Sequence, residues 1–120
     1  MMIDLPMVGS ARDVSERLAQ FLRLIADPTR RRIFLQLMQG EICNCEMVER
    51  LDLAQNLISH HLRQLRDLGL IRARRDPQDQ RWIYYSIDCD ELARIHDELG
   101  RLFDPAAVAD RAPDCRPRAG

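Results

Sequence analysis

The pattern of hydrophobic residues changes period near Gly69, and this change limits the possible fold more than any other feature of the chain. Before Gly69, apolar residues recur three and four positions apart, which predicts amphipathic helices. After it, two short runs rich in β-branched and aromatic residues flank a turn over 76–80, which predicts a β-hairpin. We expect helices over about 11–26, 28–39, 45–51 and 55–68, strands over 70–75 and 81–87, and a last helix over about 91–103. This order predicts a mostly α-helical fold with a small β-hairpin, a winged helix-turn-helix.

Capping residues suggest where the helices begin. Ser10 and Asp13 have the spacing of a capping box before the first helix. Asn44 is predicted to cap the short third helix, and Asp88 or Asp90 to cap the last one. We therefore predict a flexible arm over 1–10, a folded domain over 11–104 and a disordered tail over 105–120.

The composition excludes several classes of protein. Charged residues make up 31% of the 120 residues, and no apolar run approaches the roughly 18 residues that a transmembrane helix requires. The N-terminus lacks the basic and apolar regions of a secretion signal, so we expect a cytoplasmic protein without membrane contact. The length disfavours large enzyme folds, and we find no nucleophile–base pair or phosphate-binding glycine loop. We expect neither enzymatic activity nor an organic cofactor.

The expected helix over 55–68 has one apolar and one polar face. At about 100° per residue, Ile58, Leu62 and Leu65 fall on one stripe. The opposite face carries side chains that suit base edges or phosphates, in its first two turns: Gln55, Asn56, Ser59, His60 and Arg63. This is the part of a recognition helix that enters the major groove of double-stranded DNA. His61 falls on the apolar side, and we expect it to be a packed structural residue.

Positive charge is concentrated around this helix and the hairpin. All 18 basic residues are arginine, and residues 53–87 hold six of them against three aspartates, a net charge of +3. Arg74, Arg75 and Arg81 lie near the hairpin tip, where guanidinium groups can reach phosphates or the minor groove. The net charge of the whole chain is −1, which argues against a non-specific nucleic-acid coat. The distribution favours a localised DNA-binding surface.

Cys43 and Cys45 lie two residues apart at the start of the short third helix. Within a regular helix their side chains would point about 200° apart, but if Asn44 caps the helix, the two sulfurs can converge. Soft thiolates select thiophilic ions, and a third thiol from Cys89 or Cys115, of the same or a partner chain, would complete a three-coordinate site suited to As(III). A fourth ligand would suit Cd(II) or Zn(II). The helix start and nearby arginines are expected to lower the pKa of these thiols.

Several motifs, in order, resemble those of the ArsR/SmtB metal-sensing repressors. The matching segments are A-D-P-T-R at 26–30, E-I-C-N-C-E at 41–46, S-H-H-L-R-Q-L at 59–65, G-L-I at 69–71 and W-I-Y-Y-S-I at 82–87. The resemblance covers about 15–103 and implies a homodimer joined by the first and last helices, so that 11–104 serves both DNA binding and dimerisation. It also implies a repressor released from its operator by a metal or metalloid. The thiols favour As(III) as this effector, with Cd(II), Pb(II) and Zn(II) as alternatives.

The sequence departs from the pattern of this family at several positions. Val48 stands where arsenic sensors of the founding kind carry a third cysteine, and the arm over 1–10 has none of the cysteines of cadmium and lead sensors. Leu102 and Pro105 stand near the later ligand positions of the zinc sensors. Ala54 replaces the usual capping Ser or Thr, which predicts a looser start of the recognition helix.

Two further hypotheses remain for the same residues. One keeps DNA binding but makes the thiols a redox switch, in which peroxide or a reactive sulfur species forms a disulfide between chains or with Cys89. Reversal by a thiol reductant without a chelator would identify it. The other is a winged-helix protein–protein adaptor that does not bind DNA. The charge of the 53–87 segment disfavours the adaptor, and a missing salt-dependent DNA affinity would support it.

Overall fold

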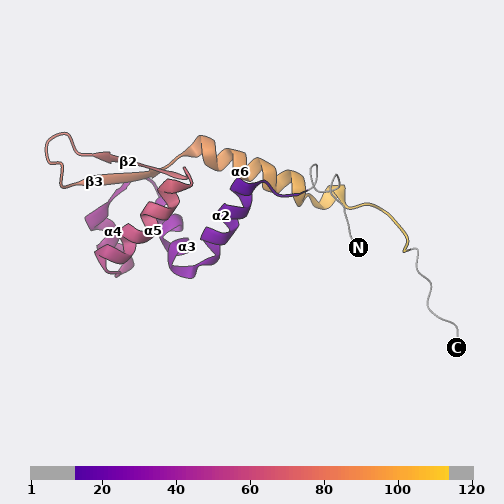
Figure 1. Cartoon of the computed structure of the whole chain (residues 1–120), viewed down its shortest axis with the longest axis horizontal. Coiled ribbons are helices and arrows are strands. Elements are labelled where there is room, and N and C mark those ends of the chain that lie inside the picture. Colours follow the sequence, from indigo (N-terminus) through magenta and orange to yellow (C-terminus); the bar gives the residue numbers. More distant parts are fainter. Residues whose placement is uncertain (1–12, 114–120) are drawn as a thin grey trace, which may run out of the picture.

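The computed structural model describes residues 13–113 and confirms the winged helix-turn-helix (Figure 1). Its elements follow the order α2 (Glu16–Ala26), α3 (Pro28–Leu37), β1 (Ile42–Cys43), α4 (Asn44–Leu51), α5 (Gln55–Asp67), β2 (Ile71–Arg75), β3 (Ile83–Ile87), α6 (Cys89–Leu102) and the 3₁₀ helix η1 (Pro105–Ala107). The hairpin of β2 and β3, here called the wing, projects at one end of the molecule, and α6 runs toward the other (Figure 1).

Among the described residues, the first helix begins later than expected, whereas the last begins at an expected cap. The first was expected from about residue 11, but α2 begins directly after Ser15, whose hydroxyl accepts a hydrogen bond from the first turn. Ser10 lies outside the described residues, as does the expected arm over 1–10. The last helix begins directly after Asp88, which is one of the two caps expected. In the described part of 105–120, η1 is the only regular element.

The sheet contains a third strand that the sequence analysis missed. The strand order is β1-β3-β2, with both pairs antiparallel, and Cys43 of β1 lies opposite Tyr84 of β3. A strand of two residues is too short to show a recognisable period. Through β1, the segment that leads into α4 is part of the same sheet as the wing.

One hydrophobic core joins the helices to the sheet. Its fully buried side chains come from α2 to α6 and from the residue before β2: Leu18, Ile33, Leu37, Met47, Ile58, Leu62, Leu65, Leu70 and Ile95. The three that belong to α5 are those of the predicted apolar stripe. Because this stripe is buried, the polar face of α5 is directed to solvent.

Ala54 leaves α5 without a side-chain cap, as expected from the sequence. Its backbone is extended, with φ −63° and ψ 142°, which is a geometry that suits a capping residue. Replacing Ala54 with serine should raise the free energy of unfolding by about 1 kcal/mol, because a hydroxyl can accept an N–H of the first turn. Ala93→Ser, in the exposed middle of α6, is the control and should lower it by roughly a few tenths of a kcal/mol. Urea unfolding measures both, and equal shifts would contradict the capping argument.

Candidate nucleic-acid interface and cysteine pair

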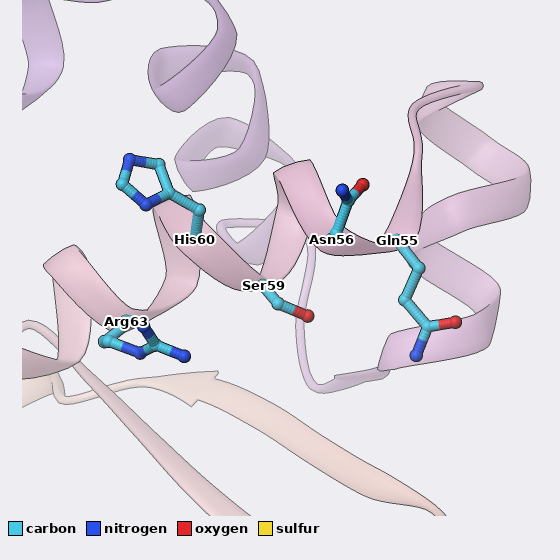
Figure 2. A pocket seen from close by; sticks show the side chains of 5 residues that line it. All are labelled: Gln55, Asn56, Ser59, His60 and Arg63. Atoms are coloured by element: carbon cyan, nitrogen blue, oxygen red, sulfur yellow. The ribbon is translucent and has the colours of Figure 1, made fainter.

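The solvent-facing side of α5 brings together the residues predicted to read DNA. One shallow hollow over the first turns of the helix is lined by Gln55, Asn56, Ser59, His60 and Arg63 (Figure 2). In Figure 2 their side chains project outward, with Asn56 and His60 toward one edge of the helix and Ser59 and Arg63 toward the other. The Arg63 guanidinium forms no hydrogen bond or ion pair with any residue that the structure describes. It is therefore available to an external acceptor.

His61 lies behind this face, and it is buried as the sequence predicted. Its ring is 6% exposed and its centroid lies 5.3 Å from that of His60. Burial lowers the pKa of His61, and the positive charge of Arg30 lowers it further, so the ring is neutral at pH 7. Within residues 13–113 its Nδ1 atom has no hydrogen-bond partner. These features suit a packing residue.

The wing arginines predicted to contact DNA all have partners within the chain. Arg74 donates two hydrogen bonds to the Glu41 carboxylate, at 2.9 and 2.7 Å, and its guanidinium lies 4.5 Å from the ring centroid of Tyr84. Arg81 is paired with Asp79 through two contacts, and Arg75 donates to the carbonyl of Gln80 at 2.7 Å. The bond to Arg74 lowers the pKa of Glu41, so this carboxylate is ionised well below pH 7. Sequence reasoning missed Glu41 and Tyr84 as partners of Arg74.

Removing the carboxylate of Glu41 should strengthen DNA binding by the wing. In Glu41→Gln, Arg74 loses its charged partner and is free to bind a phosphate. We expect about a tenfold gain in DNA affinity and a salt dependence steeper by about one unit in log K against log salt. Fluorescence anisotropy at several salt concentrations measures both quantities.

The control for this variant is Glu49→Gln. Glu49 is exposed on α4 and forms no ion pair within the described part of the chain, so its replacement causes the same charge change without releasing an arginine. Equal gains in the two variants would assign the effect to net charge and contradict the specific role of Glu41.

The sulfurs of Cys43 and Cys45 converge at the start of α4. Cys43 is buried at the end of β1, Cys45 is exposed in the first turn, and the two Sγ atoms lie 3.3 Å apart. The expected cap, Asn44, is wrong: Cys43 itself is the N-cap, and its sulfur accepts the N–H of Glu46 at 3.4 Å. The convergence occurs for the reason expected, since the first thiol lies outside the helix. Two sulfurs bound to one tetrahedral zinc ion would lie about 3.8 Å apart, so the pair fits a shared thiophilic ion with little movement.

The expectation of a lowered thiol pKa is wrong for Cys45. Its pKa is raised, first because its thiol is hydrogen-bonded with Cys43, and then because of partial burial and the adjacent charge of Cys43. Two neighbouring thiols oppose the loss of the second proton, since the second thiolate would face the first. The effect of the helix start on Cys45 is smaller than this repulsion. An ion that binds both sulfurs must therefore displace a proton that is held tightly.

The third ligand is not supplied by the described part of one chain. Cys89 is exposed at the first position of α6, and its thiol donates to the carbonyl of Ile87 at 3.9 Å. Residues 13–113 contain no group of three or more His, Cys, Asp or Glu side chains arranged to hold a metal ion. Cys115 lies outside the described residues. The structure thus brings Cys43 and Cys45 together and leaves Cys89 apart from them.

The segment that carries the two cysteines is hydrogen-bonded to the wing. Cys43 pairs with Tyr84 across the β1–β3 ladder, and the side-chain oxygen of Asn44 accepts the backbone N–H of Ile83 at 3.4 Å. Glu41, two residues before Cys43, binds Arg74 of β2, on the far side of β3. α4 also packs against α5 in the core, with Met47 and Leu51 buried. A displacement at the thiols can therefore reach the wing through the sheet, and α5 through the packing of α4.

Comparison with known proteins agrees with this geometry. Residues 27–73 match the family model described as bacterial regulatory protein, arsR family. The arsenic resistance transcriptional regulator ArsR1 of Pseudomonas putida is 39% identical over 83 residues, which cover 68% of this chain and 56% of that protein. The arsenical resistance operon repressor of Escherichia coli is 38% identical over 69 residues, covering 57% of this chain and 56% of that protein. The chain thus spans a little over half the length of both curated relatives.

A solved structure extends the match over more of the chain. The crystal structure of NolR from Sinorhizobium fredii superposes with a TM-score of 0.60 and 30% identity, covering 86% of this chain and 97% of that one. The chain belongs to the ArsR/SmtB family of transcriptional regulators. The two curated relatives are named as a transcriptional regulator and an operon repressor, which agrees with the expectation that this chain is not an enzyme. None of the described helices is both long and apolar enough to span a membrane.

Proposed function

We propose that this protein is a homodimeric repressor that binds operator DNA and is released by a thiophilic metal or metalloid. One observation carries the proposal: the thiols of Cys43 and Cys45 converge at the start of α4, and this helix packs against α5, whose polar face is free to read DNA. The ion site and the DNA-binding face would then belong to the same pair of packed helices, α4 and α5.

The polar face of α5 supplies the chemistry for reading DNA. Asn56 can bind an adenine edge and Arg63 a guanine edge with two hydrogen bonds each, and Ser59 suits either a base or a phosphate. Gln55 and His60 lie beside them in the same hollow. Arg75 and Arg81 keep unused N–H donors that face solvent and can hold the DNA backbone.

As(III) is the effector that we favour. Cys43 and Cys45 would hold it as thiolates, with a third thiol from Cys89 or Cys115 of either chain, and Cd(II), Pb(II) and Zn(II) are the alternatives. The names of both curated relatives refer to arsenic resistance. An ion held by both sulfurs would change the distance between them and weaken the hydrogen bond from the Glu46 N–H to the Cys43 sulfur, which caps α4. A weaker cap would shift α4 against α5 and β1 against the wing.

The dimer would form through α2 and α6. These helices pack together, and the Ser15 hydroxyl and backbone N–H both donate to Glu98 at 2.7 Å. Apolar side chains remain partly or largely exposed along this unit: Leu22, Leu92, Leu99, Leu102 and Phe103. Such residues are the material of a helix–helix interface. A second copy would also bring a second set of thiols and an identical recognition helix for an inverted-repeat operator.

The test is fluorescence anisotropy of the reduced full-length protein on the DNA upstream of its own coding sequence. We expect salt-dependent binding and release by As(III), with Cd(II), Pb(II) and Zn(II) titrated separately to identify the effector. Absence of salt-dependent DNA affinity would overturn the repressor and favour the adaptor. Tight DNA binding that no ion releases would overturn the metal response.

A redox response is the second candidate, and the 3.3 Å separation of the two sulfurs favours it. Oxidation by a peroxide would join Cys43 and Cys45 in a disulfide, with both thiol protons and two electrons passing to the peroxide, which is reduced to water or an alcohol. Release by peroxide, reversed by a thiol reductant without a chelator, would support this candidate. Release by As(III) under reducing conditions supports the metal response instead.

A further inference from the structure

A second hollow lies between the C-terminal turn of α5 and the wing. It has a volume of about 130 Å³ and is lined by Arg66, Ala73, Arg74, Arg75 and Ile83. Three of these five residues carry a guanidinium group. Arg75 and Ile83 face each other across the β2–β3 ladder, so the wall formed by the wing is fixed by sheet hydrogen bonds. Arg66 is exposed in the last turn of α5 and forms the helical wall.

The guanidinium groups around this hollow have spare hydrogen-bond donors. The Arg66 side chain has no partner in the part of the chain that the structure describes. Arg75 uses one donor on the Gln80 carbonyl. The Arg74 guanidinium lies on the other face of the sheet, where it binds Glu41 and contacts Tyr84, so it adds no donor to the hollow. Each guanidinium has five N–H donors, and like charges placed together favour a bound anion. The size of the hollow and the fork geometry of arginine suit a single phosphate group.

The position of the hollow continues the recognition face. Arg66 lies three residues after Arg63 and seven after Ser59, so it falls on the same edge of α5, nearer the wing. A duplex bound along this edge would bring its sugar-phosphate backbone past the junction of helix and wing. Arg66 was not among the predicted DNA-binding residues, because its hollow depends on a tertiary contact between α5 and β2.

We propose that Arg66, with Arg75, binds one phosphate group of the DNA backbone at the junction of α5 and the wing. The proposal rests on DNA binding as the proposed function. It assigns Arg66 a positioning contact that sets the register of α5 in the groove, since phosphate contacts orient a protein on DNA without reading its sequence.

The test compares Arg66→Gln with Arg66→Lys and Arg23→Gln by anisotropy at several salt concentrations. Arg23 is also the basic residue of a last helical turn, on α2, so its replacement matches the change in charge and position in the helix. For Arg66→Gln we expect roughly tenfold weaker binding to operator and scrambled DNA alike, and a salt slope reduced by about 0.9. Arg66→Lys should keep the wild-type slope, and Arg23→Gln should keep both quantities.

Three results would overturn the proposal. The first is a salt slope for Arg66→Gln equal to that of Arg23→Gln. The second is a loss of operator discrimination at an unchanged slope, which would make Arg66 a base-reading residue. The third comes from a DNA-free arm: inorganic phosphate raises the unfolding temperature of the wild type but not of Arg66→Gln, while the DNA slope stays the same, which would indicate a site for a free anion. If the wild type itself shows no salt-dependent DNA binding, the proposed function fails. If the wild type binds DNA with a salt dependence but Arg66→Gln binds as Arg23→Gln does, only the role of Arg66 is contradicted.

Discussion

Replacing Cys43 with serine should leave operator affinity within about twofold of wild type and abolish release by the effector ion. Serine is a preferred N-cap, so its hydroxyl can accept the Glu46 N–H that the Cys43 sulfur accepts now. The variant should therefore fold as stably as the wild type. It lacks one of the two converging sulfurs, and a single thiolate on Cys45 cannot hold a thiophilic ion between two protein ligands. Anisotropy with increasing As(III) measures the loss of release.

The matched control is Cys89→Ser, which replaces a thiol outside the pair. If Cys89 of either chain is the third ligand, its replacement should weaken the response to As(III) without removing it, because two sulfurs remain. If Cys115 is the third ligand, Cys89→Ser should respond as the wild type does. Full release of Cys43→Ser by the same ion concentration would contradict the role of the pair.

Replacing Arg63 with alanine should weaken operator binding by about 10- to 100-fold, which corresponds to roughly 1–3 kcal/mol for a bidentate base contact. The free energy of unfolding should change little, because Arg63 is exposed and has no partner among residues 13–113. Anisotropy on the operator and on single-base variants measures the effect, and the discrimination at one base pair should disappear in Arg63→Ala.

The control for Arg63 is Arg23→Ala, which removes the same charge from α2. A loss of affinity for Arg63→Ala that is equal on all DNA sequences would assign Arg63 to a phosphate instead of a base. Equal behaviour of both variants would remove Arg63 from the interface.

The course of α5 was predictable from the sequence because its information is local. Ile58, Leu62 and Leu65 recur at the helical period, and their burial directs the polar face outward without reference to any distant residue. The missing cap at Ala54 was predictable for the same reason. The start of α2 was not, since the spacing of Ser10 and Asp13 is as good a local signal as Ser15, and only packing selects between such signals.

The features that the sequence did not reveal depend on contacts between distant segments. β1 exists because Ile42 and Cys43 meet the strand that holds Tyr84 and Tyr85, and two residues carry no periodic signal of their own. Glu41 and Arg74 are 33 positions apart, so their pairing requires the folded sheet. The direction of the Cys45 pKa was misjudged because the distance between the sulfurs, and hence the hydrogen bond between the two thiols, was unknown.

The pairing of the wing arginines bears on how such a protein would find its operator in a genome. Arg72, Arg74 and Arg81 each carry an internal carboxylate partner, so a duplex must displace a carboxylate before the wing can bind it at full charge. This competition would reduce attraction to arbitrary DNA, whereas the base contacts of a correct operator would offset it. Because non-specific sites outnumber operators enormously, weaker binding everywhere else shortens the time spent on wrong sites and raises the fraction of protein that occupies the right one.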